Sequence, residues 1–153
     1  MVVVDASLVL DAIVAVSIAA GAFFAIIELR DMKKDRRTQI MLQASIHWTT
    51  REFEDAMGKL WRADASDAKG LEREVSYADL SMIIDFHWAM AQLGLRGLVD
   101  TRTLLGLFPF SGVWRRVKPW IIDYRAAEGQ PNVYSSLEKF AQLQEADGRF
   151  GEF

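Results

Sequence analysis

The chain of 153 residues contains no cysteine, only two histidines and only three prolines. Without cysteine it can form no disulfide bond, no thiolate metal site and no cysteine nucleophile. The two histidines, His47 and His87, stand in neither Glu-x-x-His nor His-x-x-x-His spacing, which would place two metal ligands on one helix face. We therefore predict no metal site, no cofactor and no catalytic residue, and we expect a protein that is not an enzyme.

The chain also lacks an excess of positive charge. It has 18 Lys and Arg residues against 21 Asp and Glu residues, which gives a formal net charge of −3. Domains that bind nucleic acid usually carry a basic surface that neutralises phosphates. We therefore expect no nucleic acid among the partners. A phosphate-binding loop is not expected either, because the glycines at 94–98 lack the lysine and the strand–helix context of such a loop.

One long apolar run stands near the start of the chain. Residues 8–27 read LVLDAIVAVSIAAGAFFAII and contain a single ionisable residue, Asp11. As a helix, a run of this length rises about 30 Å, which matches the hydrocarbon thickness of a bilayer. Apolar residues occur on every side of this helix, unlike the single apolar stripe of an amphipathic surface helix. We predict a transmembrane helix over residues 8–27.

Two other interpretations compete with a transmembrane helix: a cleaved signal peptide and a buried core helix of a soluble domain. A signal peptide begins with basic residues and ends at a small-residue cleavage site before a polar mature start. This chain begins MVVVDAS, with an acidic residue at Asp5, and its apolar run passes without a break into a charged segment. The buried core helix remains the main alternative.

Basic residues follow the apolar run directly, and none precedes it. They are Arg30, Lys33, Lys34, Arg36 and Arg37. By the positive-inside rule, this asymmetry predicts a single-pass protein of the inner cell membrane with its N-terminus outside and its C-terminal domain in the cytoplasm. We interpret the basic residues as determinants of topology, and contact with anionic lipid is the alternative. We divide the chain into a membrane anchor, residues 1–37, and a cytoplasmic helical domain, residues 38–153.

Small residues gather on the predicted transmembrane helix. They are Ala12, Ala15, Ser17, Ala19, Gly21 and Ala22. In a bilayer, small residues let two helices approach closely, so this face favours self-association or docking on the helix of another membrane protein. Asp11 lies about one turn from the outer boundary, where its carboxylate can reach interfacial water or contact another helix.

Beyond the apolar run the pattern is helical throughout, with no long alternation of period two. The first helix is expected to continue past the membrane, because residues 30–48 contain neither glycine nor proline. Residues 63–70, ADASDAKG, are expected to form a polar loop. Helix caps are expected at four positions where a hydroxyl or carboxylate precedes a helical stretch: Thr49, Ser76, Asp100 and Ser111.

These stretches predict an all-α fold, in which the transmembrane helix continues into a small cytoplasmic bundle of about four to five helices. Pro119 stands inside one of the expected helices. Because proline donates no backbone hydrogen bond and its ring clashes with the preceding turn, it should kink or divide that helix.

The segment VWRRVKPWIIDYR, residues 113–125, interleaves aromatic and basic side chains. Such a pattern can form a partner surface, lie among anionic lipid headgroups or stack nucleic-acid bases. It also fits an ordinary amphipathic helix, in which the apolar side chains pack inward and the cations face water. The candidate surface residues are Trp114, Arg115, Arg116, Lys118, Trp120 and Arg125.

Three stretches together resemble an uncharacterised family. They are ELRDMKKDRR after the apolar run, IIDFHWAMAQLGLRGLVD in mid-chain and VWRRVKPWIIDYR near the end. The last is similar to the family's Trp…Lys-Pro…Arg stretch, here Trp114, Lys118, Pro119 and Arg125. The family comprises small prokaryotic membrane proteins with one N-terminal span and a helical cytoplasmic domain, known only as a domain of unknown function. The resemblance implies an architecture but no activity and no catalytic residue.

These observations lead to one main functional prediction. We expect a membrane-anchored, non-catalytic accessory subunit or interaction scaffold, whose partners are the lipid bilayer and another membrane protein or a second copy of itself. The alternative is a lipid- or nucleotide-responsive regulatory module that uses residues 113–125. An enzyme built on His47, His87 and nearby carboxylates has the least support.

Overall fold

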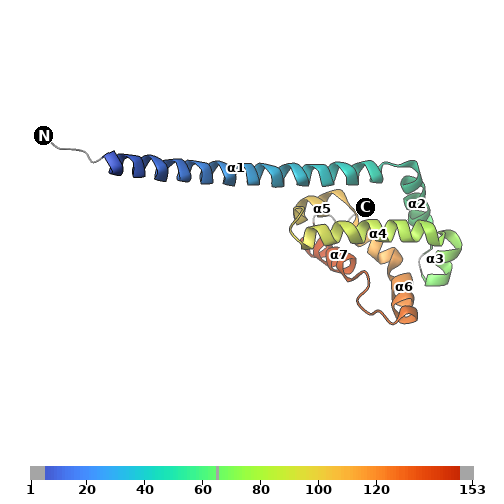
Figure 1. Cartoon of the computed structure of the whole chain (residues 1–153). Coiled ribbons are helices and arrows are strands. Elements are labelled where there is room, and N and C mark those ends of the chain that lie inside the picture. The colour runs from blue at the N-terminus through green and yellow to red at the C-terminus, as the bar shows by residue number, and fades with distance from the viewer. Residues whose placement is uncertain (1–5, 65, 149–153) are drawn as a thin grey trace. The chain divides into compact units, whose positions relative to one another are not determined.

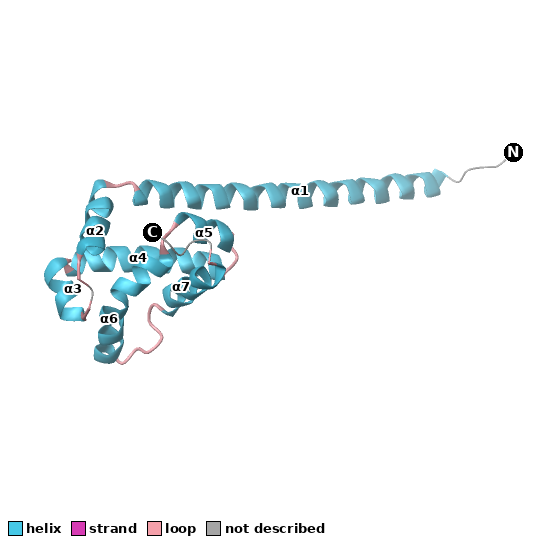
Figure 2. Cartoon of the chain, turned by 180° about the vertical axis from the view of Figure 1, so that it is seen from behind, coloured by secondary structure: helices cyan, strands magenta, loops and turns pink. Residues whose placement is uncertain are grey.

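The computed structural model describes residues 6–64 and 66–148, apart from the side chains of residues 6–9, 11, 12, 33 and 34. Within these ranges the chain forms seven α-helices and no strand (Figures 1 and 2). The predicted all-α class is therefore confirmed. The chain divides into two compact units, Met1–Leu42 and Gln43–Phe153, so the second unit begins a few residues after the domain boundary predicted from the sequence.

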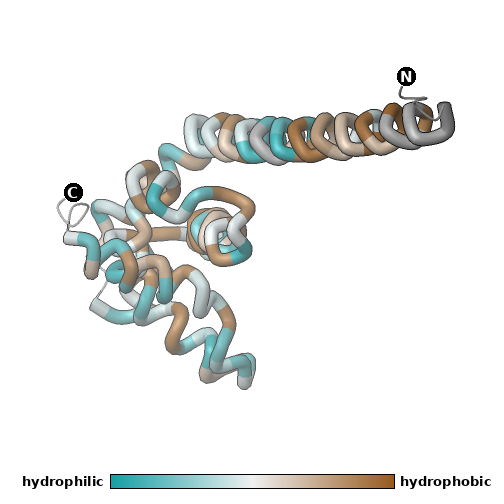
Figure 3. Tube along the Cα trace, turned by 90° about the vertical axis from the view of Figure 1, so that its left-hand side faces the viewer, coloured by the Kyte–Doolittle hydropathy of each residue, from teal (hydrophilic) through white to brown (hydrophobic). Residues whose placement is uncertain are grey.

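The first helix, α1 (Ala6–Trp48), is 43 residues long and continues from the first unit into the second. At 1.5 Å per residue it is roughly 65 Å long. The expected continuation beyond the apolar run is therefore confirmed. Along α1 in Figure 3, mainly apolar colours give way to hydrophilic colours about midway.

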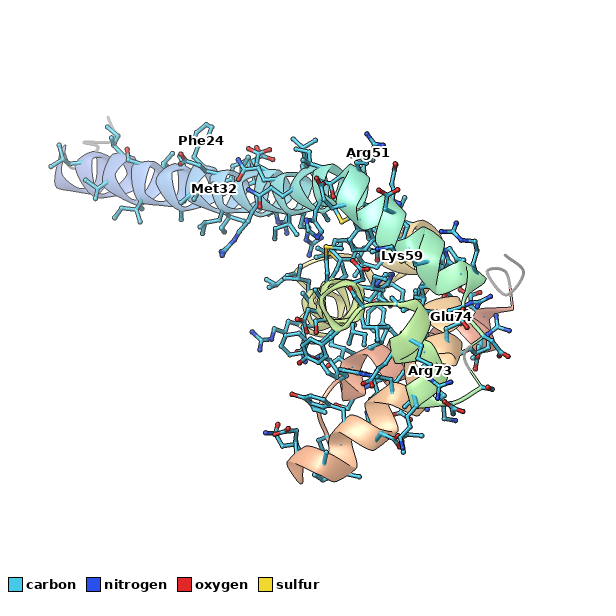
Figure 4. The ribbon with its side chains drawn as sticks, turned by 90° about the vertical axis from the view of Figure 1, so that its right-hand side faces the viewer. Phe24, Met32, Arg51, Lys59, Arg73 and Glu74 are labelled. Carbon is cyan, nitrogen blue, oxygen red and sulfur yellow. The ribbon has the colours of Figure 1, made fainter. Side chains whose placement is uncertain are left out.

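The apolar side chains in the N-terminal part of α1 are exposed where the structure describes them. Within its most apolar window no residue is buried, and Phe24 is 69% exposed. Figure 4 shows the side chains of Phe24 and Met32 standing out from the helix. A core helix buries its apolar side chains within its own domain, so this exposure favours the transmembrane interpretation over the buried core helix.

The second unit contains the end of α1 and six further helices. These are α2 (Arg51–Arg62), α3 (Ala68–Glu74), α4 (Tyr77–Leu95), α5 (Thr101–Leu107), α6 (Phe110–Glu128) and α7 (Ser135–Asp147). α4 packs against α2, α5, α6 and α7, and α6 packs against α3 and α7 (Figure 1). Their shared core includes the fully buried side chains of Phe53, Leu80, Ile84, Phe110 and Phe140.

Side-chain caps begin three of these helices where the sequence indicates helix starts. Ser76 caps α4 and Asp100 caps α5, each accepting a hydrogen bond from the backbone N–H three residues later. The cap of α2 is Thr50 rather than Thr49, because the Thr50 hydroxyl accepts the hydrogen bond from Phe53 N. These caps satisfy N–H groups that have no partner within the helix.

The expectation that Ser111 caps α6 is wrong. α6 begins at Phe110, directly after Pro109, and Ser111 is buried in its first turn. Pro119 does not divide the helix either, because α6 runs as one element to Glu128. It ends at Gly129, whose φ of 63° lies in the left-handed region that glycine adopts without strain.

Residues 63–70 do not form a simple loop, because α3 begins at Ala68. The Asp67 carboxylate accepts a hydrogen bond from the N–H of Gly70 at 2.5 Å, so this glycine lies in the first turn of a helix. α3 has only seven residues, too few to show a helical period in the sequence. For this reason the bundle has more helices than the four to five predicted.

Candidate functional site

The two tryptophans of the 113–125 segment pack inside the second unit. Both Trp114 and Trp120 are buried. Nε1 of Trp120 donates a hydrogen bond to Oε1 of Glu72 on α3 at 2.8 Å. Both rings therefore belong to the packing of α6 against its neighbours and offer no open stacking surface.

Arg116 is engaged at the end of α2. Its Nη1 donates to the carbonyl oxygens of Leu60 and Ala63 at 3.2 and 3.0 Å. The last carbonyls of a helix have no partner within that helix, so this contact stabilises the C-terminus of α2. The guanidinium also lies over the indole of Trp61, with Cζ 5.2 Å from the ring centroid, which adds a cation–π interaction.

Arg125 on α6 contacts the connection between α6 and α7 and the first turns of α7. Its Nε donates to the carbonyl of Val133 at 2.9 Å, and its Nη2 lies 3.0 Å from Oε2 of Glu138. Of the six residues predicted for a partner or headgroup surface, Arg115 and Lys118 remain exposed. The functional role of that surface stays a prediction, and these two residues are its accessible cations.

An apolar hollow of about 240 Å³ lies where the end of α1 and α2 meet the connection between α5 and α6. Its lining is Trp48, Trp61, Leu105, Gly106, Leu107, Phe108 and Pro109. All of these residues belong to the second unit. Leu107 is 55% exposed and Trp61 is 36% exposed, so the wall of the hollow is accessible from solvent.

A second hollow of about 260 Å³ shares Trp61 with the first. It is lined by Trp61, Gly112, Arg115 and Arg116. A side chain at Gly112 would not fit, because a Cβ there would lie only 2.9 Å from Cη2 of Trp61. Trp61 thus lines both an apolar hollow and a cationic one.

Gln144 from α7 holds the backbone that forms part of the apolar hollow. Its side chain is fully buried, and Nε2 donates to the carbonyls of Leu105 and Phe108 at 2.6 and 2.9 Å. Its Oε1 accepts a hydrogen bond from the N–H of Ser111 at 2.8 Å. One amide therefore ties the end of α5, the connection and the start of α6 to α7. The sequence indicated no role for Gln144, because its partners lie more than thirty residues away.

His87 lies in an aromatic cluster in the core of the second unit. The ring is fully buried beside Trp48 and Phe110, with centroids 5.6 and 5.7 Å away. Its Nδ1 donates to the carbonyl of Ile83 at 2.8 Å, while Nε2 has no hydrogen-bond partner among the described residues. Burial lowers the pKa of His87 to about 4, so the ring is neutral at neutral pH.

The other histidine has different surroundings. His47 is exposed and stacks on Phe86, with centroids 5.4 Å apart. Within the described part of the chain, no group of three or more His, Asp or Glu residues is placed to hold a metal ion.

Two Ser-x-x-Lys spacings also occur, a pattern used by some serine nucleophiles. In one pair, Ser136 is buried and its hydroxyl accepts a hydrogen bond from Nε2 of Gln92, whereas Lys139 is exposed. In the other, Ser66 is exposed just before α3, and Lys69 lies in the first turn of that helix. No hydrogen bond joins either serine to its lysine in the described structure.

The residues singled out on α1 are exposed where their side chains are described. The small residues with described side chains are Ala15, Ser17, Ala19, Gly21 and Ala22, and the basic ones are Arg30, Arg36 and Arg37. The Ser17 hydroxyl donates to the carbonyl of Ile13 at 2.8 Å, and a Cβ at Gly21 would meet no atom within 4 Å. Packing within the chain thus does not require glycine at this position. The side chains of Asp11, Ala12, Lys33 and Lys34 lie outside the described part.

A comparison with protein families gives the chain an assignment. The family model described as a domain of unknown function, DUF4760, matches residues 15–143. The chain belongs to this family. The match begins inside α1 and ends inside α7, so a single DUF4760 domain takes in most of the exposed apolar helix together with the helical bundle. The expected resemblance to an uncharacterised family is confirmed. No curated protein and no solved structure matches the chain.

Proposed function

We propose that this DUF4760 protein is a membrane-anchored, non-catalytic interaction module. The observation that carries the proposal is the apolar part of α1, which has a mean hydropathy of 2.0 in its best window and no buried residue there. An apolar helix surface that the chain leaves uncovered is unfavourable in water and favourable in hydrocarbon. The bilayer is the environment that satisfies this surface over its whole circumference.

Continuity of α1 favours an anchor over a cleaved signal peptide, which has a similar composition. The helix does not end with the apolar run but extends to Trp48. The Trp48 ring packs against Phe53 and Phe108, each with its centroid 5.2 Å away. The same helix that would cross the membrane therefore ends packed against aromatic side chains of the second unit, which suits a permanent attachment.

The proposed topology places the second unit in the cytoplasm of a cell bounded by an inner membrane. Its support is the exposed basic residues that follow the apolar run, Arg30, Arg36 and Arg37. Positive charge flanking a span stays on the cytoplasmic side. The orientation is thus a proposal from charge, separate from the proposal that α1 spans the membrane.

The proposed partner is a second copy of the chain or another membrane protein. On the last turns of α1, Leu42 and Ile46 are each 60% exposed, while Ala44 is buried. Leu42 and Ile46 are four residues apart and share one side of the helix. This uncovered apolar side at the end of α1 supports a helix partner over a freely solvated monomer.

The absence of cysteine makes the topology easy to test. We would introduce single cysteines, Val3→Cys before the apolar run and Glu54→Cys on the exposed side of α2, and treat cells with a membrane-impermeant maleimide. We expect labelling of Val3→Cys in cells with an intact inner membrane, and labelling of Glu54→Cys only after that membrane is opened. Labelling of Glu54→Cys in intact cells would overturn the proposed orientation.

The partner is tested by photo-crosslinking in native membranes. A photoreactive residue at Ile46 should give adducts with a second copy or with one other membrane protein. The same residue at Glu54, which is exposed but polar, is the matched control and should give few adducts. If position 46 yields no more adducts than position 54, this side of α1 is not a protein interface.

A further inference from the structure

We propose that the two hollows that share Trp61 bind a single-chain anionic amphiphile, that is, an acyl chain with a carboxylate or phosphate head. The proposal gives a ligand class to the lipid-responsive alternative and extends the interaction module proposed above. It concerns residues of the second unit alone, so it does not depend on whether α1 crosses a membrane.

The apolar hollow is the binding site proposed for the chain. Its volume of about 240 Å³ exceeds that of an apolar cavity that binds benzene, which is about 150 Å³. Its walls come from aromatic and aliphatic side chains and proline, among them Trp48, Leu107 and Pro109. Filling such a hollow with hydrocarbon removes apolar surface of both ligand and protein from water.

The cationic hollow is the binding site proposed for the head. Its lining contains two arginines and no carboxylate, so an anion placed there meets no acidic side chain in the wall. Within the described structure, Arg116 uses Nη1 for the end of α2, and Arg115 makes one long bond of 3.4 Å, from Nε to the carbonyl of Ser111. The remaining N–H donors are available, and hydrogen bonds from guanidinium to carboxylate or phosphate are among the strongest in proteins.

Trp61 joins these two halves into one site. It lines both hollows, and Gly112 in the cationic hollow stands one helical turn from Pro109 in the apolar hollow. A ligand that fills both must be apolar at one end and anionic at the other, as an amphiphile is between its chain and its head. A free inorganic anion would leave the apolar hollow unfilled, and a neutral hydrocarbon would leave the arginines unpaired.

Another hollow of the second unit does not suit an anion. It has a volume of about 370 Å³, and its wall includes Glu72, Asp123 and Glu128 with a single cation, Lys69. Carboxylates in a binding wall repel an anionic head. The combination of apolar wall and unneutralised arginines therefore distinguishes the pair of hollows around Trp61.

The test uses the full-length protein in phosphatidylcholine nanodiscs and a decanoate that carries bromine at its chain end. Bromine quenches tryptophan fluorescence at short range, and Trp48 and Trp61 line the apolar hollow. We expect saturable quenching by the brominated decanoate, which the Trp61→Phe variant should reduce. Competition by unlabelled decanoate or decyl phosphate should be at least tenfold stronger than by decanol, because only the anions pair with arginine.

Matched variants distinguish binding at this site from nonspecific effects of charge and hydrophobicity. Arg115→Gln should weaken binding about tenfold, the worth of one charged hydrogen bond, whereas Lys118→Gln removes an exposed cation of α6 outside the hollows and should leave binding unchanged. Leu107→Ser should weaken binding, whereas Ile122→Ser, at an exposed apolar position outside both hollows, should not. Arg116 is not varied, because it stabilises the end of α2.

Several results would overturn the proposal. They are equal competition by decanol and decanoate, competition by inorganic phosphate alone, and equal effects of Arg115→Gln and Lys118→Gln. Loss of the decanoate response in nanodiscs made with anionic phospholipid would assign the cationic hollow to bilayer headgroups instead. If the protein does not enter nanodiscs, the anchor fails, and the same titration on the protein in buffer still tests the ligand site.

Discussion

Two helices of this protein, α1 and α4, are strongly apolar, but they differ in burial. α4 buries Ile83, Ile84 and Met90 among the helices of the second unit. The apolar part of α1 buries none of its described side chains. Composition alone therefore does not decide whether an apolar helix packs inside the protein, and lipid as the surroundings of α1 is our proposal. The predictions below contrast the two regions, beginning with the largest expected effect.

Replacing an apolar residue by arginine should have the most different effects in α4 and in the apolar part of α1. Ile84→Arg places a charge in the core between helices, which should unfold the second unit at a cost of several kcal/mol. Ile18→Arg should leave that unit folded and should weaken membrane insertion by about 3 kcal/mol. The measurement is circular dichroism together with the fraction of protein that sediments with membranes. If both variants lose helical structure equally, the two helices do not differ as proposed.

The stability of the second unit should decrease at acidic pH because of His87. Its pKa is about 4 in the folded protein and near 6.5 in the unfolded chain, so between these values the unfolded state binds the additional proton. Stability should therefore fall as the pH is lowered from about 6.5 to about 4, by about 3 kcal/mol in total. Urea unfolding of the detergent-solubilised protein at several pH values measures this slope.

A His87→Phe variant is the control for this pH dependence. The aromatic ring remains, but the group that takes up the proton in the unfolded state is lost. The variant should show a clearly shallower slope between pH 6.5 and pH 4. An unchanged slope would show that another group is responsible.

Loss of the Gln144 amide should destabilise the second unit by about 3 kcal/mol. Gln144→Leu removes three hydrogen bonds and leaves the carbonyls of Leu105 and Phe108 and the N–H of Ser111 without this partner. Gln142→Leu, at an exposed position of the same helix, is the control and should have little effect. Equal midpoints of urea unfolding for the two variants would contradict this role.

The smallest difference in stability is expected between alanine substitutions at two glycines, Gly94 and Gly21. A Cβ at Gly94 on α4 would overlap the ring of Phe140 and come within 2.8 Å of a methyl group of Leu104, so Gly94→Ala should cost about 2 kcal/mol. A Cβ at Gly21 on α1 meets no described atom within 4 Å, so Gly21→Ala should leave the unfolding of the second unit unchanged. If Gly21→Ala instead reduces crosslinking between membrane proteins, a partner helix approaches this face closely.

The sequence was informative where structure depends on neighbouring residues. Ser76 and Asp100 satisfy N–H groups three positions along, so their caps follow from local spacing. The apolar run and the uninterrupted helix after it are likewise local features. The prediction that Ser111 caps a helix was wrong because a distant residue determines its environment. The Ser111 N–H donates to Gln144 on another helix.

The candidate site could not be predicted from the sequence for the same reason. The composition of residues 113–125 predicted an exposed surface, but the role of each residue depends on its packing against distant elements. Arg116 binds carbonyls more than fifty positions earlier, and Trp120 binds Glu72. Trp61 and Gly112 form a site only because α2 and α6 meet, and neither position carries a local signal for a ligand.

The most direct test of the account is the sedimentation of full-length protein from lysed cells. If α1 lies in a bilayer, the protein should pellet with membranes, remain there through high-salt and alkaline washes, and enter solution only with detergent. A variant that carries Ile18→Arg and Phe24→Arg should move to the supernatant with its second unit still helical. Full-length wild-type protein that stays in the supernatant without detergent would contradict the central claim.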